Sequence, residues 1–469
     1  DLHLCDRRQR QMCIRDSMGT WQRYQDKDVS TEVLTCYGYG DGGGGPTEEM
    51  LEQSRRLEHS IVECPAARQT GVKEFFHILE DKMDKKRLAV WDGELYLEFH
   101  RGTYTSMAQN KKYNRKAEFK NGETELYAAM ASLLDQKYLY PQEQLEHSWK
   151  LLLLNQFHDI LPGSSIHEVY EQTKKEYAEI AETSAKLIGE RMEALCGTKD
   201  ESVTVWNTLG HRRNDVVVLG ETAAEAMTDG TTVYPVQQTK DGAIVYAENL
   251  PSKGYQVLRP TSGAAAETPF AVTEAGEGYT LETPFYTIQI DANGEFTSLF
   301  DKENDREVLQ SGTTGNELRI YEDKPLQYSA WNLDIFHTEK SWKAEGVRRM
   351  EWTENGPVRA TLEIEREVMD TVIRQQIHFY AKDRRIDFET YVDWKFAEHV
   401  LKVHFPVDVH SDEATFDIQF GNVTRKLHTN TSWDQARFEV CGHKWADISE
   451  GSYGVSLMND CKYGYSMKN

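Results

Sequence analysis

The residues of this chain best suited to chemistry are an adjacent histidine and aspartate, His158 and Asp159, in the run WKLLLLNQFHDILPGSSIHE at 149–168. Four apolar residues precede them at helical spacing: Leu145, Trp149, Leu152 and Leu153. This spacing predicts a buried helix that runs up to Phe157. An imidazole and a carboxylate held at the end of such a helix suit metal or sugar binding. The alternative is a core histidine satisfied by its neighbours, beside a solvated aspartate.

The residues after this pair predict a break and a second helix. Pro162 and Gly163 stop the first helix. Ser165 and Glu168 match the S-x-x-E capping box that begins a helix. Helical patterns are expected at about 114–136, 142–158 and 166–195. The short links between them predict an antiparallel bundle.

A glycine-rich stretch, YGYGDGGGGPT at 37–47, contains a third candidate residue, the acidic Asp41. A short strand is expected at 33–37, and Pro46 suits the first turn of the next helix. Glycines between a strand and a helix can cradle phosphate, but the G-K-[ST] ending of a nucleotide loop is missing. Asp41 then either lies at the end of the strand and points into a cleft, or belongs to a flexible turn.

Polar residues follow an expected strand at Glu94–Phe99. They include Arg101 and Tyr104, within HRGTYTSMAQNKKYNR at 100–115. Such a cluster either binds hydroxyl-rich ligands or forms a solvated loop.

The chain changes character near Gly197 and becomes rich in short strand patterns. The clearest are VTVWN, DVVVLG, AIVYAE, YQVLRP, FYTIQID, RATLEIE, RQQIHFY, RIDFETYVDW and LKVHFPV. This density of strands predicts an all-β half made of stacked sandwiches. Trp433 lies in one of two stretches of this half that combine aromatic and acidic residues. Aromatic faces beside carboxylates suit sugars, and they are also common in sandwich cores.

The overall composition excludes several partners. The 469 residues include 54 basic and 77 acidic side chains, a formal charge of −23, which argues against a nucleic-acid or anionic-membrane partner. Apolar runs stay shorter than the roughly 20 residues that a membrane span needs. The seven scattered cysteines contain no C-x-x-C pair and predict reduced thiols in a cytoplasmic protein.

Several stretches together resemble the α-mannosidases of glycoside hydrolase family 38, in the bacterial and cytosolic branch. They are YGYGDGGGGPT, ELYLEFHRGTYTSMAQNKKYNRKAE, WKLLLLNQFHDILPGSSI, TSWDQARFEVCGHKWADISEGSYGV and NDCKYGY. The resemblance implies an α+β multidomain protein: part of an α/β catalytic barrel, an antiparallel helical bundle and β-sandwich domains of the galactose-mutarotase-like kind. The corresponding boundaries are 18–96 for the barrel part, 97–197 for the bundle, 198–260 for a small β domain and 261–469 for an incomplete sandwich.

The same resemblance implies zinc-dependent, retaining hydrolysis of terminal α-D-mannosides in oligosaccharide and N-glycan catabolism, with two carboxylates flanking the anomeric carbon. His158 matches a zinc ligand of the family, Asp159 a carboxylate that contacts sugar hydroxyls, and Asp41 the general acid/base. Arg101, Tyr104 and Trp433 are expected to line the cleft. The expected partners are mannose-containing oligosaccharides, and a homo-oligomer is a further expectation.

Two motifs of the family are missing from the chain. No H-x-D zinc motif precedes residue 41, and no W-x-P-D-x-F-G context supplies a nucleophile. Residues 1–17 lack an initiator Met and contain CIRDS, which resembles translated adapter sequence, so they are interpreted as an artefactual or disordered leader. The expectation is a fragment truncated at both ends, with an incomplete zinc site and no activity of its own.

Two other classes of function stay open. One is a non-catalytic carbohydrate-binding protein built on the β-sandwich half. The other is a sandwich-type sugar epimerase or lyase, against which the NQFHD and GDGGGG motifs argue.

Overall fold

The computed structural model describes residues 14–39, 43–59, 62, 65–197, 201–263 and 266–468. The chain divides into two units, Asp1–Leu95 and Tyr96–Asn469. Within the described ranges, no helix is both long and apolar enough to cross a bilayer.

The described part of the first unit contains three helices joined by irregular segments. Its helices are α2 (Ile14–Arg23), α3 (Glu48–Glu58) and α4 (Val72–Lys82). Thr47 caps α3 by accepting a hydrogen bond from the Met50 amide at 3.2 Å, and two glutamates in the first turn complement the helix dipole. Helix α2 includes the last four residues of the predicted leader, and the leader up to residue 13 lies outside the described residues.

The two strands predicted in this region, 33–37 and 94–99, are wrong. The backbone is irregular in both places. A strand needs a neighbour to take up its amide and carbonyl groups, and none of the described residues supplies one to either segment.

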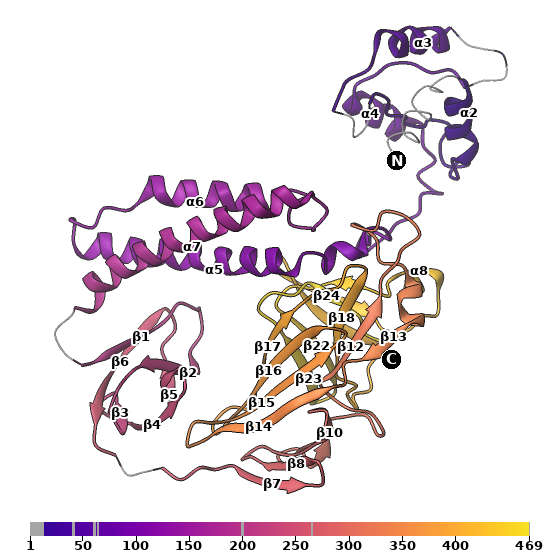
Figure 1. Cartoon of the computed structure of the whole chain (residues 1–469). Helices are drawn as coiled ribbons and strands as arrows, with labels where there is room; N and C mark the ends of the chain where they lie inside the picture. Colours follow the sequence, from indigo (N-terminus) through magenta and orange to yellow (C-terminus); the bar gives the residue numbers. More distant parts are fainter. Residues whose placement is uncertain are drawn as a thin grey trace. The chain divides into compact units, whose positions relative to one another are not determined.

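Three long helices form a bundle, as the sequence predicts. They are α5 (Ala108–Leu134), α6 (Gln142–Asn155) and α7 (His167–Cys196), and a short helix, η2 (Arg101–Tyr104), precedes them (Figure 1). Their apolar core consists of Ala117, Leu152, Tyr177 and Ile180. A buried polar contact also joins all three helices: Asn121 Oδ1 of α5 accepts from Ser148 Oγ of α6 at 2.8 Å and from Ser184 Oγ of α7 at 3.3 Å.

Three local predictions around the α6–α7 connection need correction. Helix α6 ends at Asn155, before Phe157, and a turn follows. The capping box at Ser165 does not form, because Ile166 is the first flanking residue of α7 and the Ser165 hydroxyl donates to the Asp159 carbonyl instead. Leu153 is exposed, because α5 and α7 pack on the face of α6 that carries Leu145 and Leu152.

A small six-stranded sheet follows the bundle and curls into a nearly closed barrel (Figure 1). Its strands are β1 (Val203–Asn207), β2 (Arg213–Gly220), β3 (Ala226–Thr228), β4 (Val233–Thr239), β5 (Gly242–Leu250) and β6 (Gly254–Thr261), in the order β1-β6-β3-β4-β5-β2. All pairs are antiparallel. Its interior is filled by Met227, Tyr234, Val245, Ala247, Leu250 and Leu258.

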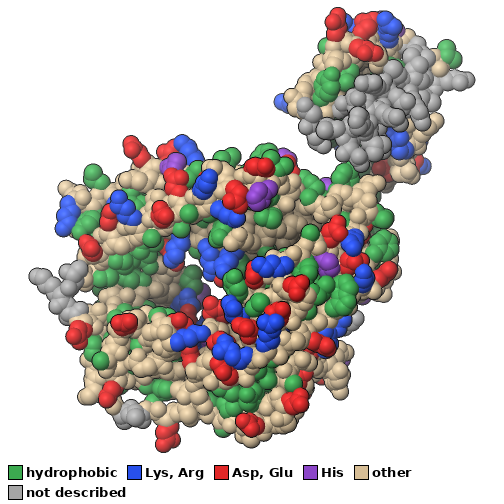
Figure 2. Space-filling model, viewed as in Figure 1, with side chains coloured by type: hydrophobic (Ala, Val, Ile, Leu, Met, Phe, Trp, Pro, Cys, Tyr) green, Lys and Arg blue, Asp and Glu red, His purple; other side chains and the backbone are tan. Residues whose placement is uncertain are grey.

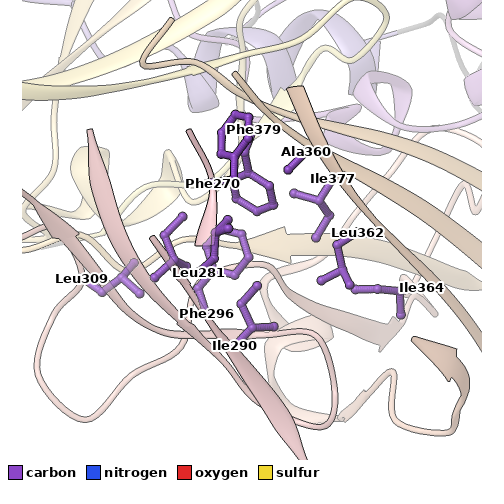
Figure 3. Close-up of a cluster of buried hydrophobic side chains, with 11 residues drawn as sticks. Phe270, Leu281, Ile290, Phe296, Leu309, Ala360, Leu362, Ile364, Ile377 and Phe379 are labelled. Atoms are coloured by element: carbon purple, nitrogen blue, oxygen red, sulfur yellow. The ribbon is translucent and has the colours of Figure 1, made fainter. Parts of the chain in front are cut away.

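Two antiparallel sheets then pack face to face over the main apolar core of the chain. One consists of β7 (Ala271–Ala275), β8 (Gly278–Glu282), β9 (Tyr286–Ile290), β10 (Phe296–Asp301) and β11 (Arg306–Glu307). The other consists of β14 (Val347–Asn355), β15 (Arg359–Val368), β16 (Thr371–Tyr380) and β17 (Ile386–Asp393). Figure 3 shows their shared core, to which Leu281 and Ile290 of the first sheet and Leu362 and Ile377 of the second contribute.

The rest of the β half forms three further sheets. The first joins β13 (Ser341–Lys343), β12 (Glu317–Glu322) and β18 (His399–His404), next to the short helix η3 (Ile335–Glu339). The second joins β20 (Gly421–Lys426), β19 (Glu413–Ile418), β22 (Trp445–Glu450) and β23 (Tyr453–Met458). The third pairs β21 (Val440–Cys441) with β24 (Gly464–Tyr465), and the short helix α8 (Ser432–Ala436) precedes it. Each strand pattern predicted for this half overlaps a strand, although LKVHFPV extends three residues beyond β18.

One arginine joins the bundle to the C-terminal sheets. Arg115 of α5 is 1% exposed and donates to the carbonyls of His443 at 3.1 Å and Lys462 at 3.0 Å. It also donates to Asn459 Oδ1, and its guanidinium lies 4.4 Å from the centre of the Tyr463 ring. This side chain therefore holds segments more than 300 residues away in sequence against α5.

Replacing Arg115 is expected to destabilise the protein strongly. Arg115→Met leaves several buried acceptors without a donor, so the free energy of unfolding should fall by about 3 kcal/mol. The neighbouring Lys116→Met is the control, because it removes only an exposed ion pair to Asp460, worth less than about 1 kcal/mol. Urea unfolding of both variants is the measurement, and equal losses would contradict the role assigned to Arg115.

Candidate functional site

The predicted pair lies on the turn between α6 and α7. The side chains of His158 and Asp159 are 70% and 39% exposed, and His158 Nε2 lies 3.2 Å from Asp159 Oδ2. The His158 ring also contacts the Phe157 ring, with centres 4.2 Å apart. The pair is therefore open to a ligand from solvent, in contrast to the buried histidine considered above.

Contacts from the start of α7 hold Asp159 in place. Its carbonyl accepts from the Ser165 hydroxyl at 2.7 Å and from the Tyr170 hydroxyl at 3.3 Å. Its side-chain Oδ1 accepts from the Ser164 hydroxyl at 3.0 Å. The Tyr170 hydroxyl also accepts from the Ser165 amide at 3.0 Å, so a closed set of hydrogen bonds fixes the backbone carbonyl of Asp159, while its carboxylate accepts from Ser164.

Contacts from the start of α5 hold the same turn from its other side. Asn110 Nδ2 donates to the Ile160 carbonyl at 3.2 Å. Lys111 Nζ donates to the carbonyls of Leu161 at 2.9 Å and Pro162 at 3.1 Å, and to the Ser106 carbonyl before α5. Lys111 is only 4% exposed. The exposed pair thus stands on a turn that is anchored by buried polar groups.

A glycine lets the turn approach α5 closely. Gly163 has φ of +99°, and a Cβ atom there would stand 2.7–2.8 Å from the side chain and backbone of Ser106. Both the backbone conformation and the space require glycine at this position.

Arg101 and Tyr104 lie on η2, next to the segment before β21. Arg101 donates from Nε to the Tyr96 hydroxyl at 3.1 Å and from Nη2 to the Ala436 carbonyl at 2.6 Å, and it lies 4.4 Å from the centre of the Phe438 ring. Because Ala436 ends α8, Arg101 holds the helix that carries Trp433.

The two aromatic candidates differ in their exposure. Trp433 is 58% exposed on α8. Tyr104 is partly buried, and this burial raises the pKa of its phenol. Trp433 can thus meet a ligand, while Tyr104 has the environment of a packed residue.

The site is incomplete as a metal centre in the part of the chain that the structure describes. No three His, Cys, Asp or Glu side chains in this part come together in a group able to hold a metal ion. A catalytic zinc ion needs three protein ligands, and His158 with Asp159 offers two. Asp41 lies outside the described residues.

The residues that support the turn are not evident from the sequence. Lys111 and Asn110 belong to the run QNKKYN, which has the composition of a solvated helix face. The available signal is that two adjacent lysines on one helix must point in different directions, so one can face inward. Sequence alone does not indicate which one.

Three family models match the chain. The glycosyl hydrolases family 38 N-terminal domain matches residues 6–94, the alpha mannosidase middle domain residues 98–195, and the family 38 C-terminal domain residues 281–469. This chain belongs to glycosyl hydrolase family 38. The middle-domain match contains both sides of the anchored turn, from Asn110 to Tyr170.

Curated relatives of this family 38 chain cover it almost completely. Alpha-mannosidase 2C1 of Homo sapiens is 34% identical over 463 residues, which is 97% of this chain and 43% of that protein. Alpha-mannosidase G of Dictyostelium discoideum is 33% identical over 94% of this chain and 44% of that protein. An alpha-mannosidase of Saccharomyces cerevisiae is 33% identical over 96% of this chain and 40% of that protein. The chain thus spans less than half the length of these relatives.

Solved structures of the family share the fold. An alpha-mannosidase from Enterococcus faecalis superposes with a TM-score of 0.70 at 16% identity, over 90% of this chain and 57% of that one. A second Enterococcus faecalis structure, described as a protein of family 38, has a TM-score of 0.68 at 16% identity, over 96% of this chain and 60% of that one.

Substituting Gly163 is expected to strain the turn. Gly163→Ala forces an L side chain into the left-handed region against Ser106, so the free energy of unfolding should fall by about 1–3 kcal/mol. Gly122→Ala is the control, because this exposed glycine of α5 has open space around it and alanine should stabilise the helix by about 0.5–1 kcal/mol. Chemical denaturation of both variants measures the two shifts, and a neutral Gly163→Ala would contradict the close approach.

The buried amine of Lys111 predicts a pH dependence of stability. Burial lowers the pKa of Lys111 from 10.5 to about 7. Cys441 opposes this shift, and the positive charge of Lys462 adds to it. Between these values the unfolded chain binds the proton and the folded chain does not, so the free energy of unfolding should rise with pH from about 7 to about 10. Lys111→Met should remove that part of the rise. Unfolding curves at several pH values, compared between the two proteins, measure it; parallel curves would refute the lowered pKa.

Proposed function

We propose that the protein acts as a zinc-dependent, retaining α-mannosidase that removes terminal α-D-mannose from oligosaccharides, including N-glycans. The observation that carries this proposal is the exposed His158–Asp159 pair on a rigidly anchored turn, within a chain that matches all three family 38 domains. The names of the curated relatives support the choice of α-mannoside as substrate.

The pair offers two kinds of contact to a sugar. Asp159 keeps acceptor capacity on its carboxylate, which can take hydrogen bonds from two neighbouring ring hydroxyls. His158 presents an imidazole that can bind a hydroxyl or serve as one metal ligand. Because the backbone of the turn is fixed from both sides, these groups are held in position before a ligand arrives.

Zinc dependence is proposed from the family, and the described residues do not complete the site. His158 would supply one ligand, and further ligands would have to come from elsewhere than the residues described around the turn. When bound, zinc would polarise or orient sugar hydroxyls.

Retaining hydrolysis needs a nucleophilic carboxylate and an acid/base carboxylate about 5 Å apart. Asp41 is proposed as the acid/base on its sequence context, and no residue of this chain is proposed as the nucleophile. We therefore propose that these 469 residues alone do not turn over mannosides.

The remaining candidates are proposed to line the cleft. Trp433 is exposed enough to stack on a sugar face, and Arg101 would contribute by holding the helix that carries it. Tyr104 would contribute through packing beside Arg101.

The proposed setting is a cytoplasmic protein that acts on mannose-containing oligosaccharides and forms a homo-oligomer. Cys36, Cys196 and Cys461 are free thiols, which suits a reducing compartment. On the visible face of the molecule, Lys and Arg side chains are interspersed with Asp and Glu, as expected of a protein that does not bind nucleic acid (Figure 2).

The proposal predicts different results for the native protein and for this chain alone. The native protein, purified from its source, should hydrolyse an aryl α-mannoside, lose this activity with a chelator and regain it with zinc. The first sugar released should be the α anomer, as NMR can show. The 469-residue chain should show no turnover under the same conditions.

Several outcomes would overturn parts of this proposal. Turnover by the 469-residue chain would refute its predicted inactivity. Release of the β anomer would refute retention, and activity that survives chelation would refute zinc dependence. Glycan binding by the native protein without hydrolysis of any mannoside would instead support the carbohydrate-binding alternative.

A further inference from the structure

Lys111 is a buried lysine, and the hydrogen bonds of its amine in the part of the chain that the structure describes go to backbone carbonyls. Its Nζ bridges two segments about fifty residues apart: Ser106, before α5, and Leu161 with Pro162, on the turn after α6. We propose that Lys111 is a positioning residue, which fixes the turn bearing His158 and Asp159 and so sets the place of this pair in the sugar site. The functional part of this inference rests on the proposed function above.

The geometry uses the full donor capacity of the side chain. Below about pH 7, where the folded protein keeps the proton on Lys111, the ammonium group has three N–H donors, and three carbonyl oxygens surround Nζ. Hydrogen bonds from a charged donor are about twice as strong as neutral ones. Leu161 and Pro162 follow Asp159 by two and three residues, so these bonds act directly on the backbone that carries the pair.

Packing alone does not explain why a lysine occupies this buried position. A lysine is rarely as buried as the 4% exposure of Lys111, because desolvating a charge is costly. A methionine would fill a similar volume without that cost. The three carbonyls would then lack a donor, and buried carbonyls without partners are themselves unfavourable. The hydrogen bonds to the three carbonyls therefore explain the buried amine.

The other contacts of the turn do not replace the hydrogen bonds of Lys111. Ser164, Ser165 and Tyr170 fix Asp159 from the α7 side. On the α5 side, Asn110 holds Ile160 through one neutral hydrogen bond. Lys111 provides the charged contact on this side. Without it, α5 holds the segment between Ile160 and Gly163 only through the weaker bond from Asn110, and the Tyr170 hydroxyl of α7 donates to the Ile160 carbonyl at 3.3 Å.

The test compares Lys111→Met with two matched lysine variants. Lys112→Met removes the neighbouring exposed lysine of α5. Lys402→Met removes a partly buried lysine of the β half, whose side chain is 14% exposed and paired with Glu439, and so controls for a general loss of stability. If Lys111→Met fails to fold, Lys111→Gln, which keeps two donors on a shorter side chain, takes its place.

The first measurement is amide hydrogen exchange in the folded 469-residue chain at a pH below 7, where the Lys111 amine is protonated. In Lys111→Met, exchange over residues 157–166 should accelerate by about tenfold or more, the loss expected for one hydrogen bond to a charged donor. Exchange in the middle of α7 should stay unchanged. Neither Lys112→Met nor Lys402→Met should accelerate the turn selectively.

The second measurement is the ¹⁵N NMR signal of His158, assigned with His158→Gln. A carboxylate only accepts, so contact with Asp159 Oδ2 favours the tautomer protonated at Nε2. Lys111→Met should move this signal towards that of a freely exchanging histidine, and the two control variants should not. A purely structural loss elsewhere in the protein would leave the His158 signal in place.

The results separate this inference from the proposed function. Unchanged exchange and an unchanged His158 signal in Lys111→Met would overturn the positioning role, whatever the mannosidase assays show. Selective loosening of the turn would support the role even if the native protein proved inactive on mannosides, in which case the proposed function alone would fail.

Discussion

A row of buried polar groups on one helix determines how the rest of this unit fits together. Lys111 and Arg115 of α5 are almost fully buried, and each would be strongly unfavourable if its donors had no partners. Their partners are carbonyl oxygens from two distant places, the turn after α6 and the segment 443–462. Helix α5 can therefore be buried only when the turn and the C-terminal segment are both in their native places. These polar contacts therefore select one arrangement. An apolar face can pack in many ways, whereas few arrangements give both buried side chains acceptors for their donors.

The bundle and the sandwich differ in how far polar contacts hold them together. The bundle core has few large apolar side chains, and Asn121 joins its three helices by hydrogen bonds to Ser148 and Ser184. The sandwich depends instead on a continuous apolar core between two sheets. A polar side chain again sets the contact between the small barrel and the sandwich: Gln237 donates to the Arg359 carbonyl at 3.0 Å and accepts from the amides of Val358 and Arg359 at 2.9 Å. In both places directional bonds fix the relation between parts whose apolar surfaces alone would not specify it.

The sequence predicts helices and strands correctly where the apolar periodicity is clear and the element has a neighbour to pair or pack with. The strands after Gly197 alternate clearly and each finds a neighbour, so the β half follows from the sequence, as do the three long helices. The strands expected at 33–37 and 94–99 fail because a strand is a property of a pair. The capping box at Ser165 fails because its hydroxyl has a competing acceptor, the Asp159 carbonyl. For the candidate site, the motif predicts His158 and Asp159, and their role stays a prediction. Lys111 cannot be predicted in this way, because its burial is decided by a turn fifty residues away.

The exposure of His158 follows from the way its turn is supported. Leu153 and Phe157, predicted to be buried, are 60% and 52% exposed, so apolar packing does not hold the end of α6. The hydrogen bonds from α5 and α7 do, and they act on the backbone between Asp159 and Pro162. Backbone anchoring leaves the side chains of the pair free, since none of their atoms has to be buried to hold the turn. A histidine fixed by packing would be rigid but inaccessible. Here the backbone is fixed while the imidazole and the carboxylate stay open to solvent, which is what binding of a hydroxyl-rich ligand or a metal ion requires.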